Sequence, residues 1–311
     1  AATLASTTNI TAATGITLTA TTGLGSQNGP VATVTNLTNE RGKYTHGAVW
    51  IGSTANTNTV NYVDGILTNP VSTIAAGKSI ADSLGLKRFW VQSGVTISLL
   101  ADMDNYVFDG FNFNFNTSGG TRSISGTTVR NAFVGTAASV FSGATAPRFE
   151  NCEFSTGTVT IPAANLHDCS FNTGVVTLGT GNTDLVNCQS VVAGSSTPSF
   201  TIPVGTVNVS FRRWSGGITI GGITSGTTIS IDVVSGGTIT LNGADGTVNV
   251  RGMVNAITDN RTGSPTLNQL AALNRTVLAT PTNITAGTIT TATNVTTVNS
   301  LAANVITAAS M

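Results

Sequence analysis

Four carboxylate side chains are spaced so that they could carry out acid–base chemistry. Glu150 and Glu153 flank an asparagine, and Asp168 and Asp232 follow further along the chain. Glycoside hydrolysis needs two carboxyl groups about 5–9.5 Å apart, one of them with a raised pKa. However, Asp168 stands at a position where the other copies of an internal repeat have asparagine. Glu150 and Glu153 are separated by a bend of the chain at the asparagine between them. The sequence therefore predicts no catalytic residue.

Three acidic residues, Asp102, Asp104 and Asp109, have the composition of a calcium-binding loop. A loop of that kind also needs a glycine and a closing glutamate at fixed positions, and this frame is missing. We therefore expect a solvated loop and no metal site. The two histidines, His46 and His167, lie in no recognisable motif with a nucleophile. No cofactor is expected.

The segment around Arg212, Arg213 and Trp214 places two cations beside an indole ring. Aromatic faces with arginine donors can hold sugars or acidic groups. Trp214 also follows a bend in the repeat, so its ring is more readily explained as part of the core. We therefore predict no binding site at this segment.

The charge balance excludes several classes of partner. The chain has 13 basic and 13 acidic residues among 311, and only 8% of its residues are charged, against about 25% in a typical globular domain. Basic residues occur in runs of no more than two, so nucleic acid and anionic membrane surfaces are not expected partners. No stretch of about 20 apolar residues predicts a membrane span, and no signal peptide is visible.

An internal repeat must position these side chains. Short alternating strands bounded by glycine or asparagine recur every 17 to 24 residues. Stacked coils of a parallel β-helix require this pattern, because each coil can bury its inward residues only against its neighbours. The sequence therefore predicts an all-β fold, a right-handed single-stranded parallel β-helix of about eight coils between Phe89 and Val254.

One corner of each coil is expected at an asparagine or aspartate, whose short side chain tolerates a left-handed backbone. The predicted corners are Asn131, Asn151, Asp168 and Asn187. The residue after each corner should point inward, which gives an interior stack of Ala132, Cys152, Cys169 and Cys188. Three cysteines without a CxxC pair fit neither a disulfide framework nor a zinc site, so we predict buried free thiols.

Both ends of such a β-helix expose strand edges and need a cap. A helix over residues 72–84 with Ser72 as N-cap is predicted at one end, and a short helix that opens at Ser264–Pro265 and carries Leu267, Leu270 and Leu273 at the other. The predicted divisions are extended oligomerising segments at 1–45 and 279–311, a lead-in with the N-terminal cap at 46–100, the β-helix at 101–258, and the C-terminal cap at 259–278.

The terminal segments, residues 1–39 and 276–311, contain no charged residue and few large apolar ones. Ordering each backbone residue costs about 1–2 kcal/mol, which so sparse a set of apolar side chains cannot offset within one chain. We therefore expect these Thr-rich segments to be ordered only by other chains, most simply in a homotrimer.

The coiled region resembles the pectate-lyase-like right-handed β-helices found in tail fibres, tailspikes and other appendages of tailed bacteriophages. Residues 46–51 (HGAVWI), 64–74 and 84–89 are similar to the segment that leads into such β-helices, and residues 282–291 and 300–304 resemble the Thr/Ala/Asn linkers of long appendage proteins.

This resemblance implies a structural virion protein, assembled in the host cytoplasm, with other virion proteins as partners and a host surface glycan as a further candidate partner. Two alternatives stay open: a polysaccharide-depolymerising tailspike domain and a bacterial surface adhesin.

Overall fold

The computed structural model describes residues 44–53, 64–191 and 197–273. All pairings between its named strands are parallel, and an isolated antiparallel bridge joins Ile66 and Asn69 ahead of them. The terminal segments 1–39 and 276–311 lie outside the described residues, so the expectation that other chains order them stays a prediction.

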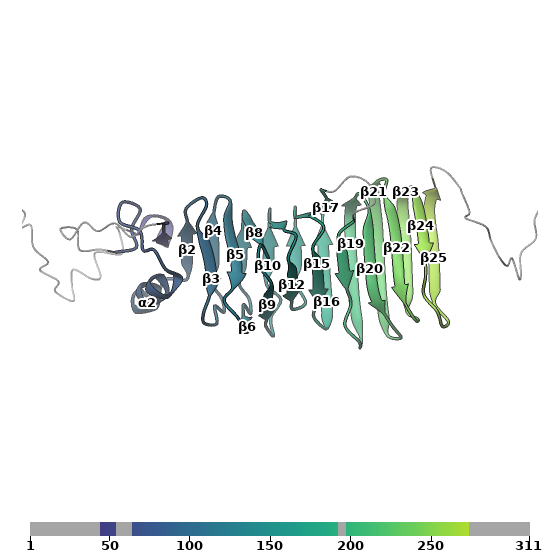
Figure 1. The fold of residues 1–311 in the computed structure, drawn as a ribbon, viewed down its shortest axis with the longest axis horizontal. Helices are drawn as coiled ribbons and strands as arrows, with labels where there is room; N and C mark the ends of the chain where they lie inside the picture. Colours follow the sequence, from purple (N-terminus) through teal and green to yellow (C-terminus); the bar gives the residue numbers. More distant parts are fainter. Residues whose placement is uncertain (1–43, 54–63, 192–196, 274–311) are drawn as a thin grey trace, which may run out of the picture. The chain divides into compact units, whose positions relative to one another are not determined.

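The strands form a right-handed parallel β-helix with three ladders along its length (Figure 1). The first ladder contains β1 (Val49–Ile51), β2 (Arg88–Val91), β4 (Val107–Gly110), β7 (Thr128–Arg130), β10 (Arg148–Glu150), β13 (Asn165–His167), β16 (Gly181–Val186), β19 (Val207–Ser215), β21 (Thr227–Ser235), β23 (Thr247–Val254) and β25 (Thr266–Leu273). The second contains β3 (Thr96–Leu99), β5 (Phe113–Thr117), β8 (Ala132–Val134), β11 (Glu153–Phe154), β14 (Ser170–Phe171) and β17 (Gln189–Ser190). These two ladders share one 17-stranded sheet.

The third ladder is a separate 8-stranded sheet. It contains β6 (Thr121–Ser123), β9 (Ser139–Ser142), β12 (Thr158–Ile161), β15 (Val175–Leu178), β18 (Ser199–Thr201), β20 (Ile218–Ile223), β22 (Thr238–Gly243) and β24 (Ala256–Asp259). The predicted all-β parallel β-helix is therefore confirmed. Its first ladder has nine strands from β2 to β23, which are eight coils apart, in agreement with the number predicted.

The strands alternate between buried and solvent-facing side chains, which is the period of two expected for a sheet with one buried face. Aromatic rings stack from turn to turn inside the β-helix: Phe89 lies 5.0 Å from Phe108, and Phe154 lies 4.8 Å from Phe171 between ring centroids. Each turn thus buries its apolar residues against the next one, and a single core runs along the ladders.

The four predicted corners have the predicted backbone conformation. Asn131, Asn151, Asp168 and Asn187 have φ between 52° and 58°, in the left-handed region. Their side chains bond in two pairs, with Asn151 Nδ2 donating to Asn131 Oδ1 at 2.8 Å and Asn187 Nδ2 donating to Asp168 Oδ1 at 2.5 Å. The same corner continues at Asn112 and Arg213, which the repeat pattern had not indicated.

The predicted interior stack is also confirmed. Cys152, Cys169 and Cys188 are buried free thiols, and Ala132 is buried in the turn before them. Each sulfur contacts backbone carbonyl oxygens, such as that of Val129 at 3.4 Å from Cys152 Sγ. Burial, together with hydrogen bonding to the neighbouring thiols, raises the pKa of Cys169 well above its ordinary value. These cysteines therefore act as small core residues.

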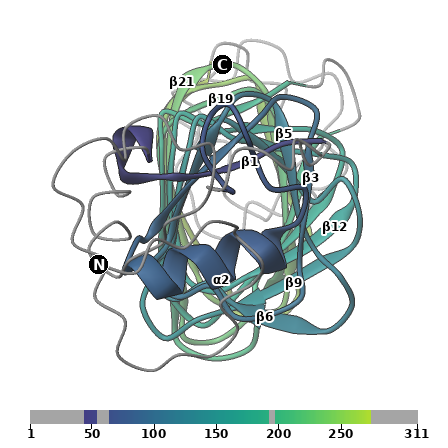
Figure 2. The same ribbon diagram turned by 90° about the vertical axis from the view of Figure 1, so that its left-hand side faces the viewer.

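The N-terminal helix forms close to its predicted position. Helix α2 (Ile74–Leu84) lies across the N-terminal end of the β-helix (Figure 2). The predicted N-cap Ser72 is wrong by one residue: Thr73 is the N-cap, and its Oγ1 accepts a hydrogen bond from the Ala76 amide at 3.2 Å. A short 3₁₀ turn, η3 (Thr45–Gly47), precedes β1. Within the described residues no helix is long and apolar enough to cross a membrane.

The helix predicted after Ser264–Pro265 is wrong, because Leu267, Leu270 and Leu273 lie in strand β25. This strand pairs with β23 along its whole length, from Thr247↔Thr266 to Val254↔Leu273. Leucines three residues apart suit a helix, but the free edge of β23 offers a complete set of backbone hydrogen bonds. The chain therefore adds one more rung to the ladder.

Candidate functional site

The outer surface of the first ladder gathers many of the charged side chains. Inward neighbours such as Phe108, Val129 and Phe149 are fully buried, so the residues beside them face outward. We call this set the charged face; it consists of Arg88, Asp109, Arg130, Arg148, Glu150, Asp184, Arg212, Asp232 and Arg251.

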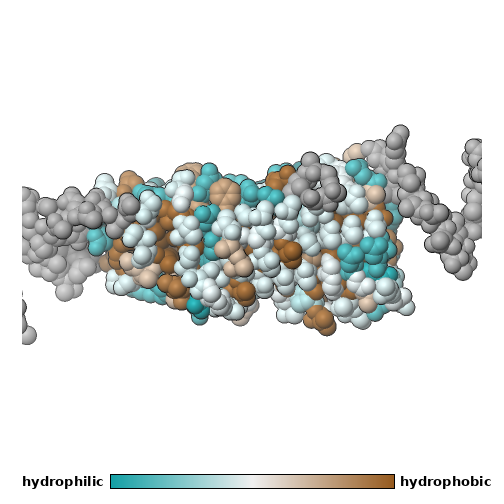
Figure 3. All heavy atoms as spheres, in the orientation of Figure 1, coloured by the Kyte–Doolittle hydropathy of each residue, from teal (hydrophilic) through white to brown (hydrophobic). Residues whose placement is uncertain are grey.

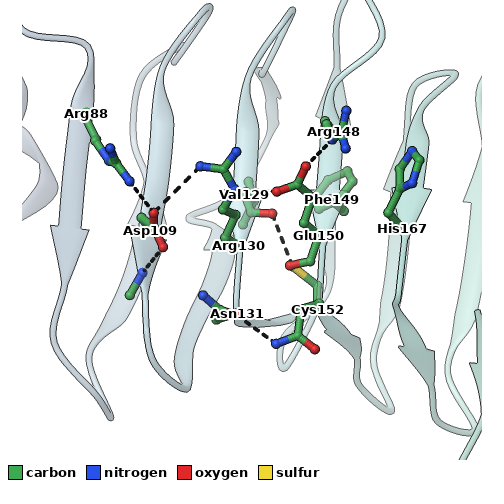
Figure 4. A network of polar contacts seen from close by, with 12 residues as sticks. Arg88, Asp109, Val129, Arg130, Asn131, Arg148, Phe149, Glu150, Cys152 and His167 are labelled. Carbon is green, nitrogen blue, oxygen red and sulfur yellow. Dashed lines mark hydrogen bonds and ion pairs between the residues drawn. The ribbon is translucent and has the colours of Figure 1, made fainter.

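Ion pairs of alternating sign connect the first five of these residues. Arg88 lies 2.6 Å from Asp109, and Arg130 lies 3.7 Å from the same carboxylate. Arg130 and Arg148 both contact Glu150, so four consecutive strands of the ladder are linked (Figure 4). Further along the face, Asp184 pairs with Arg212 and Asp232 with Arg251. The arginines and carboxylates hold the rungs in register and leave a polar surface.

The electrostatics of Glu150 do not suit a general acid. Burial alone would raise the pKa of this carboxyl, but the hydrogen bond from Arg130 and the charges of Arg130 and Arg148 outweigh it and lower the pKa below its ordinary value. A glycosidase acid needs the opposite shift, because it must carry a proton near neutral pH. Glu150 is therefore held as an ion-paired carboxylate.

Two of the other three candidate carboxylates, Glu153 and Asp232, lie on other parts of the surface, whereas Asp168 lines a polar hollow together with Glu150. Glu153 is on β11, beyond the corner at Asn151, and faces out from the second ladder. Asp168 is a corner residue that accepts from Asn187. Asp232 lies 3.5 Å from Arg251 near the other end of the charged face. The structure thus separates Glu150 from Glu153 and Asp232, and the hydrogen bond from Asn187 gives Asp168 a structural role at the corner.

A shallow polar hollow of about 380 Å³ opens where the charged face meets the corner. It is lined by Arg130, Asn131, Arg148, Glu150, Asn151, His167 and Asp168. Figure 4 shows His167 on the strand after Arg148 and Glu150, with no dashed contact to them. The hollow offers guanidinium and amide donors beside carboxylate acceptors, which suits hydroxyl-rich or anionic groups.

An aromatic patch lies at the N-terminal end of the charged face; it consists of His46, Trp50, Trp90 and Phe111. The ring of Trp90 lies 5.6 Å from that of His46, 5.3 Å from Trp50 and 6.1 Å from Phe111. Phe111 is 64% exposed. Because Trp90 is in register with Asp109 on the next strand, the patch adjoins the ion pairs, and sequence analysis had not indicated it.

The suggested calcium loop has a structural role. Asp102 Oδ1 accepts a hydrogen bond from the Ser123 amide and Asp104 Oδ1 from the Ser125 amide, both at 2.8 Å. These bonds tie one turn to the next, whereas Asp109 is on β4 in the charged face. Within the ranges that the structure describes, no group of three or more His, Cys, Asp or Glu side chains could hold a metal ion.

The Arg212-Arg213-Trp214 segment is divided by the corner. Trp214 is fully buried and its Nε1 donates to the Gly216 carbonyl at 3.0 Å, as the core interpretation predicted. Arg212 is bound to Asp184 on the outer face, and Arg213 is the corner residue. The cations and the indole therefore do not form a common site.

The remaining surface is weakly polar. Most atoms on the face shown in Figure 3 have intermediate hydropathy, with hydrophobic and hydrophilic side chains scattered among them.

In comparisons with known proteins, no family model, no curated protein and no solved structure matches the chain. The structure shows the fold alone, a parallel β-solenoid that is compatible with a pectate-lyase-like β-helix.

Proposed function

We propose that the chain is a structural protein of a tailed-bacteriophage virion, part of a tail fibre, spike or similar appendage. The observation that carries this proposal is the unbroken first ladder, which runs from β1 to β25 around one continuous core. Ten steps of about 4.8 Å give this ladder a length of roughly 48 Å. Since each turn contacts only its neighbours, such a solenoid acts as a stiff spacer of fixed length.

The proposal includes contact with a host surface glycan. The aromatic patch offers the exposed ring of Phe111 and the indole of Trp90, and the partly exposed guanidinium of Arg88 lies close by as a charged donor. Rings of this kind, flanked by arginine, are common anchors of binding surfaces. Under this proposal the protein holds a glycan without cutting it, because Glu150 is committed to Arg130 and Arg148.

Homotrimerisation and attachment to other virion proteins complete the proposal. A β-helix with uncharged, Thr-rich terminal segments suits one section of a long trimeric appendage. The location of the mature protein would then be the virion.

Quantitative mass spectrometry of gradient-purified phage particles from the source culture tests this assignment. We expect peptides from residues 64–191 and 197–273 at a fixed copy number that is a multiple of three per particle. Recovery of the protein in the cell envelope fraction, with none in particles, would contradict the proposal and favour the surface adhesin.

A further inference from the structure

The last strand of the first ladder ends in an open edge. All eight residues of β25 are in register with β23, and among the described residues no strand pairs with the opposite edge of β25. A parallel strand directs about half of its amide and carbonyl groups to each side. β25 therefore presents a row of backbone donors and acceptors to a further strand.

This edge lacks the features that usually prevent strand pairing. Natural edge strands are short, bulged, or interrupted by lysine or proline. β25 has eight residues, no charged residue and no proline between Thr266 and Leu273, and its register with β23 is unbroken. Such an edge would pair with other chains in solution unless the assembled protein already covers it.

The core is also incomplete at this end. Val248 on β23 and Ile239 on β22 are almost fully buried, whereas their partners in the last turn, Leu267 and Ile257, are only partly buried. Another rung would bury Leu267 as β25 buries Val248. The hydrophobic gain adds to the backbone hydrogen bonds of the edge.

A ladder of amides gives the edge a chemical preference. Asn268 Nδ2 donates to Asn249 Oδ1 at 2.9 Å, and Asn260 Nδ2 donates to Asn242 Oδ1 at 3.0 Å. In each pair the later residue donates to the earlier one. A strand with asparagine over Asn268 would continue this order.

The last turn is held rigidly before any partner binds. The side chain of Arg261 is fully buried and makes two bonds to the Asp259 carboxylate, at 2.8 and 2.7 Å. Arg261 also donates to the carbonyls of Asp245 and Gly246 in the preceding turn, at 3.2 and 2.9 Å. A preformed edge lowers the entropic cost of adding a strand.

The chain contains a second stretch of sequence that resembles β22 and the start of β23, with the same number of residues between the two similar parts. Residues 237–249 (GTITLNGADGTVN), which include β22 and the start of β23, are identical at seven of thirteen positions to residues 287–299 (GTITTATNVTTVN). The first four and the last three residues match, so the two matching stretches are equally far apart in both sequences. Residues 287–299 lie outside the described residues.

We propose that the open edge of β25 binds the 287–299 segment of a second copy of this chain as an additional parallel rung. Exchange of this segment between copies would cover the edge of each one and complete its core. This inference concerns self-assembly only and does not depend on the virion assignment.

The test uses the full chain and two double variants with equal added charge. Ile289→Lys with Val298→Lys alters the residues that match the inward-facing Ile239 and Val248, and the control, Ala292→Lys with Thr293→Lys, alters residues between the two matching stretches. Hydrogen exchange at residues 266–273 and molar mass by light scattering are measured for each protein.

We expect the wild-type chain and the control to be oligomeric and protected at β25. The Ile289/Val298 variant should be monomeric, with exchange at least about tenfold faster at β25. Three results would overturn the proposal. The first is fast exchange at β25 in the wild-type chain, and the second is that the Ile289/Val298 variant changes neither exchange nor molar mass. The third is a wild-type chain that is monomeric but protected at β25, with the Ile289/Val298 variant removing that protection.

Discussion

Replacing Arg261 with alanine should open the last turn of the β-helix. Its guanidinium joins the end of β24 to the preceding turn through Asp259, Asp245 and Gly246, and it also reaches the Thr266 carbonyl at 3.4 Å. Without it, the Asp259 carboxylate and the Asp245 and Gly246 carbonyls each lose the guanidinium as a donor, although Gly246 still accepts from the Thr266 amide at 2.9 Å. The loop between β24 and β25 is then held mainly by its backbone amides, such as those of Thr262 and Gly263, which donate to the Gly243 and Ala244 carbonyls of the preceding turn.

The size of the effect follows from the burial of the pair. Removing one partner of a buried ion pair costs about 3–5 kcal/mol. The Arg261 side chain is 0% exposed but that of Asp259 is 22% exposed, so water can partly solvate the remaining carboxylate. We therefore expect the lower end of this range, about 3 kcal/mol, which is roughly a hundredfold change in an opening equilibrium.

Native-state hydrogen exchange resolved by segment measures this opening at residues 256–273. Arg251→Ala is the matched control, because Arg251 is 66% exposed and lies 3.5 Å from Asp232; an exposed pair is worth about 0–1 kcal/mol. Arg261→Lys should recover only part of the protection, since lysine lacks the planar fork. Equal exchange in the Arg261 and Arg251 alanine variants would refute the reasoning.

Three further results are expected. Asn151→Ala should lower the free energy of unfolding by about 1–2 kcal/mol in urea titrations, because a left-handed backbone is unfavourable for alanine. Asn151→Gly should lower it by less, and the reverse order of the two variants would contradict the corner assignment. Asp82 has a pKa lowered to about 2 by hydrogen bonds from Lys78 and Tyr106, so its contribution to the stability of the N-terminal cap is present at neutral pH and is lost as the pH falls from about 4 through 2. Exchange in α2 that is unchanged across this interval would argue against that role. The purified protein should release no reducing ends from host capsule or lipopolysaccharide, and release that Glu150→Gln abolishes would overturn the non-enzymatic proposal.

The β-helix could be predicted because its corners leave a local mark. A left-handed residue at the same place in successive turns favours asparagine or aspartate, so Asn131, Asn151, Asp168 and Asn187 reveal the period directly. The small residue after each corner reveals which side is the interior. Where the corner residue is Arg213, this mark is missing, and the period has to be inferred from the strands.

The last strand could not be predicted from its own residues. Leu267, Leu270 and Leu273 have the spacing of a helical face, and nothing within residues 264–273 indicates that β23 offers a free edge. The outcome depends on a pairing partner about 19 residues away, which local periodicity does not contain.

The charged face depends on the same long-range relation. Arg88, Asp109, Arg130 and Glu150 are 21, 21 and 20 residues apart and alternate in sign. This signal was present in the sequence, but it becomes visible only when charged residues are aligned on the coil period. The aromatic patch leaves no such signal, because His46 reaches Trp90 from outside the repeat.

Immunogold electron microscopy of purified particles tests the proposed function most directly. Antibodies raised against the described β-helix should place gold on a tail fibre, spike or similar appendage, in numbers consistent with a few trimers per particle. Gold on the bacterial cell surface, with unlabelled particles in the same preparation, would contradict the assignment to the virion.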